Sequence, residues 1–254
     1  MSFEEDLVKE INELRTNPKA YTKKIQKYIS YFDGNLLNLP GSEASIETQE
    51  GPQAYTEAIK HLSNVKGVAP LEPSKGLGRV AKDFITEIQK VSPEEASSID
   101  LDKMVEKHGN YSGNISRALD FGGETPEQVL VNLIVSDGDP TRDQRETLLS
   151  QNLKKVGVGF GTHDEFKYVT VIICCTKFVN SKDSNDNGFI GGTKYEKIDE
   201  NADGEETDPA KKVVSESKTE KVVMEKGKKV KIIKITKVLA DGSKETETIK
   251  ENVK

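Results

Sequence analysis

Charged and amide side chains crowd into one short stretch, residues 136–145, which reads SDGDPTRDQR. Nearby carboxylates in such a turn could act as a general acid and a general base. The stretch has no histidine or cysteine, and no serine is placed as a nucleophile. Two arginines stand among three aspartates, which favours local ion pairing over acid–base catalysis. The polar residues concerned are Asp137, Asp139, Arg142, Asp143, Gln144 and Arg145.

Other reactive residue types are few. His61, His108 and His163 are the only histidines, and none has a partner close in sequence, so we expect surface or packing roles. Cys174 and Cys175 are adjacent in an apolar strand, where burial raises the pKa of a thiol and makes it inert. The run GVGFG at 157–161 lacks the Gly-Lys-Ser/Thr of a phosphate loop. Its small residues are expected to let a helix pack closely on a strand.

Two acidic segments, 183–188 (DSNDNG) and 199–204 (DENADG), match the first half of a calcium-binding loop. Such a loop ends in a bidentate glutamate at its twelfth position. That position holds Lys194 in the first segment and Ala210 in the second. We therefore interpret both segments as flexible turns.

Helices and strands can be predicted along the first 179 residues. Ser2 and Glu5 form a capping box before an amphipathic helix, and Asn17-Pro18 begins a second. Gly51-Pro52, Ser74 and Thr125-Pro126 begin three more, and residues 33–51 are expected to form a long loop. Strands are predicted at 154–161 and 166–179, the second apolar enough to be central in a sheet. The fold class is therefore α+β, a layered domain over residues 1–179.

The composition changes after this domain. Residues 180–221 have few large apolar side chains, which predicts a flexible acidic linker. Residues 222–254 are predicted to form a β-hairpin around Asp241-Gly242, with strands at 228–239 and 244–251 that expose edge hydrogen-bonding groups. An isolated hairpin is marginally stable, so it needs a surface to pair with.

Charge and hydropathy exclude some classes of function. The net charge is −6 and the pI about 5.4, which argues against nucleic-acid binding. No apolar run is long enough for a membrane span, and the segment MSFEEDLVKE is unlike a signal peptide. Two adjacent cysteines offer no disulfide framework, which fits a reducing compartment. We expect a cytoplasmic protein.

Five motifs in order resemble the CAP superfamily, which includes cysteine-rich secretory proteins, antigen 5 and pathogenesis-related proteins (the SCP-like domain). The motifs are INELRTNPKAY, GLGRVAKDF, GNISRAL, ETPEQVLVNLIVSDGDPTRDQRETLL and KKVGVGFG with YVTVIICCTKF, spread over residues 3–179. The resemblance implies an α/β/α sandwich with a central cleft. The extension after residue 180 lies outside it.

The family's cleft usually carries two histidines and two acids that can hold a divalent metal. The resemblance puts Gln144 where one histidine stands and Gly113 where one acid stands. No histidine occurs around residues 93–98, where the other is expected, and only Asp137 keeps an acidic place. Because zinc needs at least three protein ligands, we expect no metal, no cofactor and no catalytic residue.

These observations predict a non-catalytic structural adaptor in an intracellular assembly, cytoskeletal or ciliary in our interpretation. Its tail would add strands to a partner's sheet and meet an acidic surface such as that of tubulin. The alternatives are a lipid or small-molecule binding CAP protein and a hydrolase with a re-equipped cleft. Guarding of an exposed edge, or folding back onto residues 1–179, would also explain the tail. The expected partner-binding residues are Lys228, Lys229, Lys231, Ile233, Ile235 and Lys237.

Overall fold

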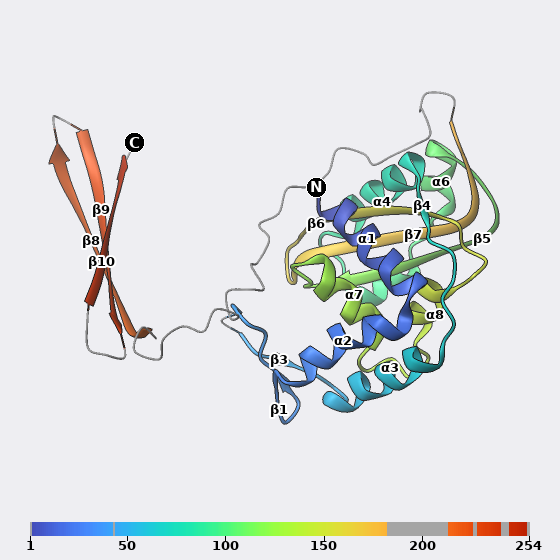
Figure 1. Ribbon diagram of the computed structural model, residues 1–254. Helices are drawn as coiled ribbons and strands as arrows, with labels where there is room; N and C mark the ends of the chain where they lie inside the picture. The colour runs from blue at the N-terminus through green and yellow to red at the C-terminus, as the bar shows by residue number, and fades with distance from the viewer. Residues whose placement is uncertain (1, 43, 182–212, 226–227, 240–243, 253–254) are drawn as a thin grey trace. The chain divides into compact units, whose positions relative to one another are not determined.

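The computed structural model describes residues 2–42, 44–181, 213–225, 228–239 and 244–252 (Figure 1). The chain divides into two compact units, Met1–Lys197 and Ile198–Lys254, and each is described by itself. The two calcium-like segments, 183–188 and 199–204, lie outside the described residues, as does the turn at Asp241-Gly242.

Eight helices are described in the first unit, and the predicted helix starts are confirmed. Ser2 and Glu5 form the capping box, the Ser74 hydroxyl accepts from the Leu77 N–H, and the Thr125 hydroxyl accepts from the Gln128 N–H. These caps satisfy main-chain donors that a helix start would otherwise leave unpaired. The helices are α1 (Phe3–Thr16), α2 (Pro18–Ile29), α3 (Pro52–Asn64), α4 (Lys75–Ile88), α5 (Pro93–Ser98), α6 (Asp102–His108), α7 (Pro126–Val135) and α8 (Asp143–Leu149).

A four-stranded sheet in the order β4-β6-β7-β5 forms the centre of this unit. Its strands are β4 (Glu72–Pro73), β5 (Gly109–Phe121), β6 (Lys155–His163) and β7 (Lys167–Asn180). β4 runs parallel to β6, and the other pairs are antiparallel. The prediction that the apolar strand is central is confirmed, because β7 lies between β5 and β6.

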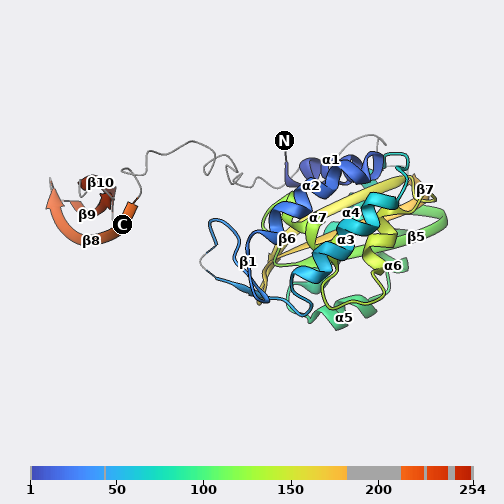
Figure 2. The ribbon, with the colours of Figure 1, turned by 60° about the horizontal axis from the view of Figure 1, so that its bottom comes forward.

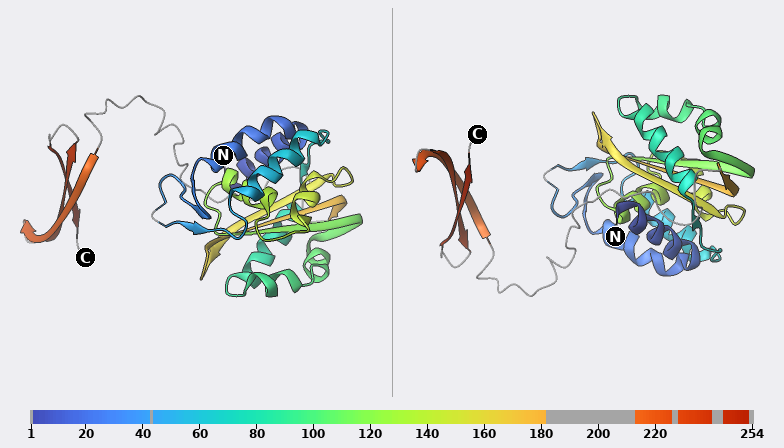
Figure 3. Two further views of the ribbon diagram at one scale, coloured as in Figure 1. Left: turned by 90° about the horizontal axis from the view of Figure 1, so that it is seen from below. Right: turned by 90° about the horizontal axis from the view of Figure 1, so that it is seen from above.

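Helices cover both faces of this sheet (Figures 2 and 3), and the α+β prediction is confirmed. Alternate residues of β7 belong to different cores, because successive strand side chains point to opposite faces. Ile172 and Cys174 pack with α1, α2, α3, α7 and α8. Ile173 and Cys175 pack with α4, α5 and α6.

The glycines of β6 allow α4 to approach closely, as the sequence predicted. A Cβ atom on Gly157 would overlap the backbone of Leu77 and Gly78. One on Gly159 would lie 2.9 Å from Ile85 Cδ1, and one on Gly161 would lie 2.7 Å from Ile85 Cγ2. Small residues at every second position thus leave one face of the strand free for the helix.

Residues 33–51 are not wholly a loop. They contribute to a small antiparallel sheet of two-residue strands, β1 (Phe32–Asp33), β2 (Leu36–Leu37) and β3 (Ile46–Glu47). Leu37 lies opposite both Phe32 and Ile46 and is buried. Strands this short leave no periodic pattern in a sequence, which is why turn-forming residues dominated the prediction.

The second unit contains β8 (Val213–Glu225), β9 (Lys228–Leu239) and β10 (Lys244–Asn252), antiparallel in the order β10-β9-β8. Two expectations were wrong. Residues 213–221, assigned to the linker, belong to β8, because alternating polar residues also suit a strand. Strand 228–239 is not an edge, because β8 and β10 pair with it on both sides. None of the helices in the described residues has the length and apolar run needed to span a bilayer.

Candidate functional site

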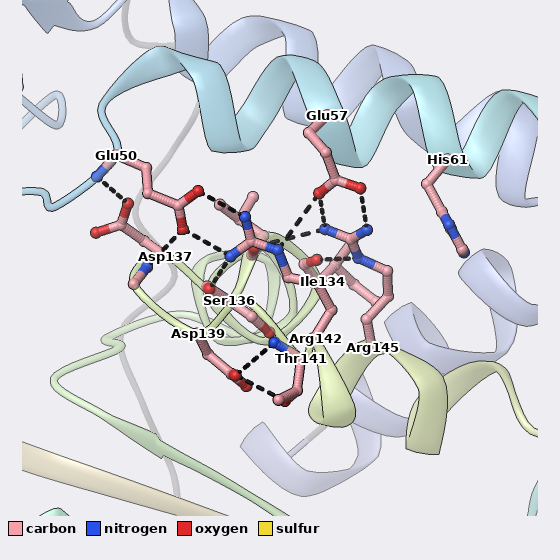
Figure 4. Close-up of polar contacts among 12 residues, drawn as sticks. Glu50, Glu57, His61, Ile134, Ser136, Asp137, Asp139, Thr141, Arg142 and Arg145 are labelled. Atoms are coloured by element: carbon pink, nitrogen blue, oxygen red, sulfur yellow. Dashed lines mark hydrogen bonds and ion pairs between the residues drawn. The ribbon is translucent and has the colours of Figure 1, made fainter.

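The carboxylate of Asp137 binds main-chain groups of a distant loop (Figure 4). Asp137 follows α7 in a turn that Ser136 opens with a left-handed backbone, φ 49°. Its Oδ2 accepts from the Gln49 N–H at 2.6 Å and its Oδ1 from the Glu50 N–H at 2.8 Å. Both carboxylate oxygens therefore tie the segment before α3 to the end of α7.

Arg142 makes a bidentate pair with Glu50. Its Nη1 and Nη2 lie 2.8 and 2.7 Å from the two carboxylate oxygens, and Nη1 also donates to the Ser136 carbonyl. The Gly138 N–H donates to Glu50 at 2.8 Å. The hydrogen bonds from Arg142 and then Gly138 lower the pKa of Glu50, so this carboxylate is held ionised.

Arg145 is 1% exposed and pairs with Glu57 of α3. Its Nη1 and Nη2 lie 2.8 and 2.6 Å from the Glu57 oxygens, and its Nε donates to the Ile134 carbonyl at 2.6 Å. The hydrogen bond from Arg145 lowers the pKa of Glu57. The expectation of local ion pairing was wrong in its partners, because Arg142 pairs with Glu50 and Glu57 and Arg145 with Glu57, all 85 or more residues away.

Asp139 forms hydrogen bonds within the turn itself. One of its oxygens accepts from the Thr141 N–H at 2.9 Å and from the Thr141 hydroxyl at 2.7 Å. These bonds lower the pKa of Asp139 and close the turn on itself. Both Asp137 and Asp139 thus accept hydrogen bonds from neighbouring groups of the fold.

Gln144 stands at the position where the resemblance implies a metal-binding histidine. Its side-chain oxygen accepts from the Leu119 N–H at 2.8 Å. The amide therefore satisfies a main-chain donor on the outer side of β5. An imidazole has a different reach and would replace this bond rather than reproduce it.

Gly113, at the implied acidic position, forms a β-bulge. The register between β5 and β7 shifts between Ser112 and Ile115, and Gly113 has φ +79°. A Cβ atom there would lie 2.9 Å from the Cβ atom of Thr176. Glycine is therefore required by the backbone and by the space, since other residues rarely adopt this φ.

Gly113, Asp137 and Gln144 do not share a ligand-binding arrangement. Gly113 packs on Thr176, whereas Gln144 contacts β5 at Leu119, six residues farther along the strand and about 20 Å away at the rise of a β-strand. Asp137 contacts the segment before α3. Among the residues that the structure describes, no group of three or more His, Cys, Asp or Glu side chains could hold a metal ion.

A polar hollow of about 570 Å³ lies at one end of the sheet. The Lys154 ammonium beside it donates to the Gln151 carbonyl at 2.9 Å. The side chains at its wall include Asn114, Gln151, Asn152, Lys154 and Thr176. Val68 and Ala69 also line the hollow, so it offers both hydrogen bonds and apolar contact.

The histidines and cysteines occupy structural positions. His163 is buried, and its Nδ1 accepts from the Glu165 and Phe166 N–H groups, which leaves Nε2 to donate to the Val91 carbonyl. Burial raises the pKa of the Cys174 thiol to about 12 and that of Cys175 to about 11, so both are inert, as predicted.

Sequence reasoning missed the buried charged residues Asp120 and Arg15. Asp120 accepts from the Asn132 amide at 2.9 Å and from the Gly123 N–H at 3.0 Å, and burial raises its pKa to about 7. Arg15 is fully buried and donates to the carbonyls of Ala69, Leu148, Ser150 and Leu153. Arg15 ends an amphipathic helix on its apolar side, a signal that could have identified it.

The contacts of residues 136–145 thus hold together α3, α7, α8 and β5. No known protein-family model matches the chain, and no curated protein matches it at a significant level.

Proposed function

We propose that this chain is a non-catalytic structural adaptor of an intracellular protein assembly, built on a CAP-type α/β/α sandwich. The main support for this proposal is that the candidate cleft residues are engaged in contacts within the fold. Asp137 and Gln144 bind main-chain N–H groups, and Arg142 and Arg145 are saturated by glutamates. A group engaged in this way is not free to bind a substrate.

The contacts of residues 136–145 act as a clamp, by which we mean the bonds of Asp137, Arg142 and Arg145 to Glu50, Glu57 and their neighbours. A bidentate pair of an arginine and a carboxylate is directional as well as strong. The Arg145 guanidinium is buried, so removing its partner would leave a charge without compensation. The clamp therefore supports a rigid scaffold, which is what an adaptor requires.

The C-terminal sheet is the proposed docking element. Among its described strands, β8 and β10 each have one neighbour, so each offers an edge to which a partner strand can add. The proposed contact residues Lys228, Lys229, Lys231, Ile233, Ile235 and Lys237 all lie on the central β9. The main-chain groups of β9 pair with those of β8 and β10. A partner would therefore recognise β9 through the charge of its lysines.

Charge still favours an acidic partner. Lys231 stands opposite Glu251, and Lys237 opposite Glu245, so part of the lysine run is balanced within the sheet. The three described strands nevertheless carry nine lysines and six glutamates. A net positive sheet speeds encounter with an acidic surface, such as a cytoskeletal polymer of the tubulin type.

Truncation tests the proposal. Tagged full-length chain and a variant ending at Ser181 are expressed in the native cell, crosslinked, and compared by mass spectrometry of the captured proteins. The adaptor function predicts that the truncated variant loses a defined set of crosslinks. An unchanged set would exclude the second unit as the docking element.

A full-length variant with reduced positive charge separates the two modes of docking. Replacing Lys228, Lys229, Lys231 and Lys237 with glutamine keeps the strands and removes the positive charge. Loss of the same crosslinks would assign recognition to charge, and their retention would assign it to the edges of β8 and β10.

The two alternative functions receive no comparable support. The hollow beside Lys154 mixes polar side chains with Val68 and Ala69, so its lining gives no specific support for a lipid. Asp120 has the raised pKa expected of a catalytic acid, yet it does not line this hollow. We therefore propose neither lipid binding nor hydrolysis.

A further inference from the structure

The strand β5 has an open outer edge over half of its length. β5 pairs with β7 on one side only among the described strands and forms one border of the sheet (Figure 1). The Leu119 N–H donates to Gln144, so the main-chain groups of Leu119 face away from β7. Because these groups alternate in direction along a strand, those of Ile115 also face outward.

The same alternation gives the direction of the main-chain groups in the first half of β5. The Ser181 N–H donates to the His108 carbonyl, so His108 faces its neighbour and Tyr111, three residues later, faces outward. Within the described residues, the N–H groups of Tyr111 and Ile115 make no hydrogen bond outside the strand pairings. Residues 110–114 are exposed, and Tyr111 is 36% exposed.

This open half lacks the usual protection of an edge strand. Natural edges carry lysines, prolines or bulges that discourage pairing with other chains. The segment 109–116 reads GNYSGNIS and has no charge and no proline. The bulge at Gly113 is the one protective feature left on this segment. Its geometry restricts which strands can pair with the edge.

A bulged strand does not match a regular one. Ser112 pairs with Lys177 and Ile115 with Cys175, so two residues of β5 oppose the single residue Thr176. A regular strand on the outer side would fall out of register by one residue. A second copy of β5 carries the same extra residue. If this second copy runs antiparallel to the first, related to it by a two-fold axis at Gly113, both strands carry the extra residue. Equal numbers of residues then face each other across the pairing.

We propose that two copies of this chain associate through their β5 strands, antiparallel about Gly113, to form one continuous sheet. Tyr111 of each copy then lies opposite Ile115 of the other, and their outward N–H and C=O groups pair. With no charge between residues 109 and 116, the two identical edges do not repel each other.

The dimer gives the adaptor two C-terminal units and hence a gain in avidity for a repetitive partner. It does not depend on the proposed function, because β5 belongs to the first unit and can be tested without a partner. Loss of the dimer and loss of docking by the second unit are therefore separate outcomes.

Sedimentation of the full chain over a range of concentrations tests the proposal. The wild type is expected to show a reversible dimer. In this register Ser112 of one copy lies opposite Asn114 of the other, so the double variant Ser112→Lys/Asn114→Lys places like charges together twice. Its Kd should rise about tenfold or more, as should that of Ser112→Glu/Asn114→Glu.

Mixing the two variants distinguishes pairing from misfolding. A one-to-one mixture should recover the dimer as a heterodimer, because lysine then lies opposite glutamate. A mixture that stays monomeric, or a wild type that is monomeric at every concentration, would overturn the proposal. The control variant Thr56→Lys/Ser63→Lys adds the same charge to exposed positions of α3 and should leave the dimer unchanged.

Discussion

Arg145 and Glu57 lie 88 residues apart in sequence and form a bidentate ion pair, with nitrogen–oxygen distances of 2.8 and 2.6 Å. The arginine is 1% exposed, whereas the glutamate side chain is 46% exposed. The pair joins α3 to α8. Because only the arginine is buried, its charge needs the glutamate for compensation, whereas the exposed glutamate would remain hydrated without the arginine.

Removing the carboxylate should therefore destabilise the domain. Glu57→Ala leaves the buried Arg145 guanidinium without its carboxylate partner, and we expect the free energy of unfolding to fall by about 2–3 kcal/mol. Urea unfolding followed by circular dichroism measures this. Glu87→Ala, at an exposed position of α4, is the matched control and should change stability by less than about 0.5 kcal/mol. Equal effects of the two variants would contradict the role of the pair.

Asp120 should make stability fall as pH rises. Burial raises its pKa from 3.8 to about 7 in the folded protein, so between these values the folded chain binds more protons than the unfolded chain. Its contribution is fully present below about pH 4 and is lost as pH rises through about 7, with a total of about 4 kcal/mol at most.

The variant Asp120→Asn isolates this effect. The difference in unfolding free energy, wild type minus variant, should decrease between pH 4 and pH 7, because other titrating groups cancel. Chemical unfolding at several pH values gives this difference. A flat difference over that range would show that Asp120 ionises normally.

The glycines of β6 should differ in their tolerance of a methyl group. Gly157→Ala places Cβ against the backbone of Leu77 and Gly78, which cannot move without shifting α4, and should cost about 2–3 kcal/mol. Gly161→Ala meets the side chain of Ile85 instead of backbone, with Cβ 2.7 Å from Cγ2, and should cost less, about 1–2 kcal/mol. Thermal unfolding of both variants checks the order, and a reversed order would refute the close packing of α4.

Local signals in the sequence predicted much of this fold. Ser2, Ser74 and Thr125 mark helix starts because capping depends on residues within one turn. The apolar run of β7 predicted a central strand for the same local reason. β5 was missed, because its polar, bulged segment around Gly113 gives neither alternation nor an apolar run.

The contacts of the candidate site were beyond sequence reasoning. Glu50 and Glu57 precede their arginine partners by 92 and 88 residues, and nothing near either glutamate indicates the pairing. The sequence singled out Asp137 only as an acidic position of the family's cleft. Its role in the fold, acceptance of two main-chain N–H groups, depends on a loop that only the folded chain brings near.

The unfolding free energy of Asp137→Ala, with and without added zinc ions, tests the central claim most directly. If residues 136–145 are a clamp, the variant loses about 1–2 kcal/mol through its two lost hydrogen bonds, equally in both conditions, and zinc does not stabilise the wild type. Stabilisation of the wild type by zinc that the variant abolishes would contradict the account, because Asp137 would then be a metal ligand.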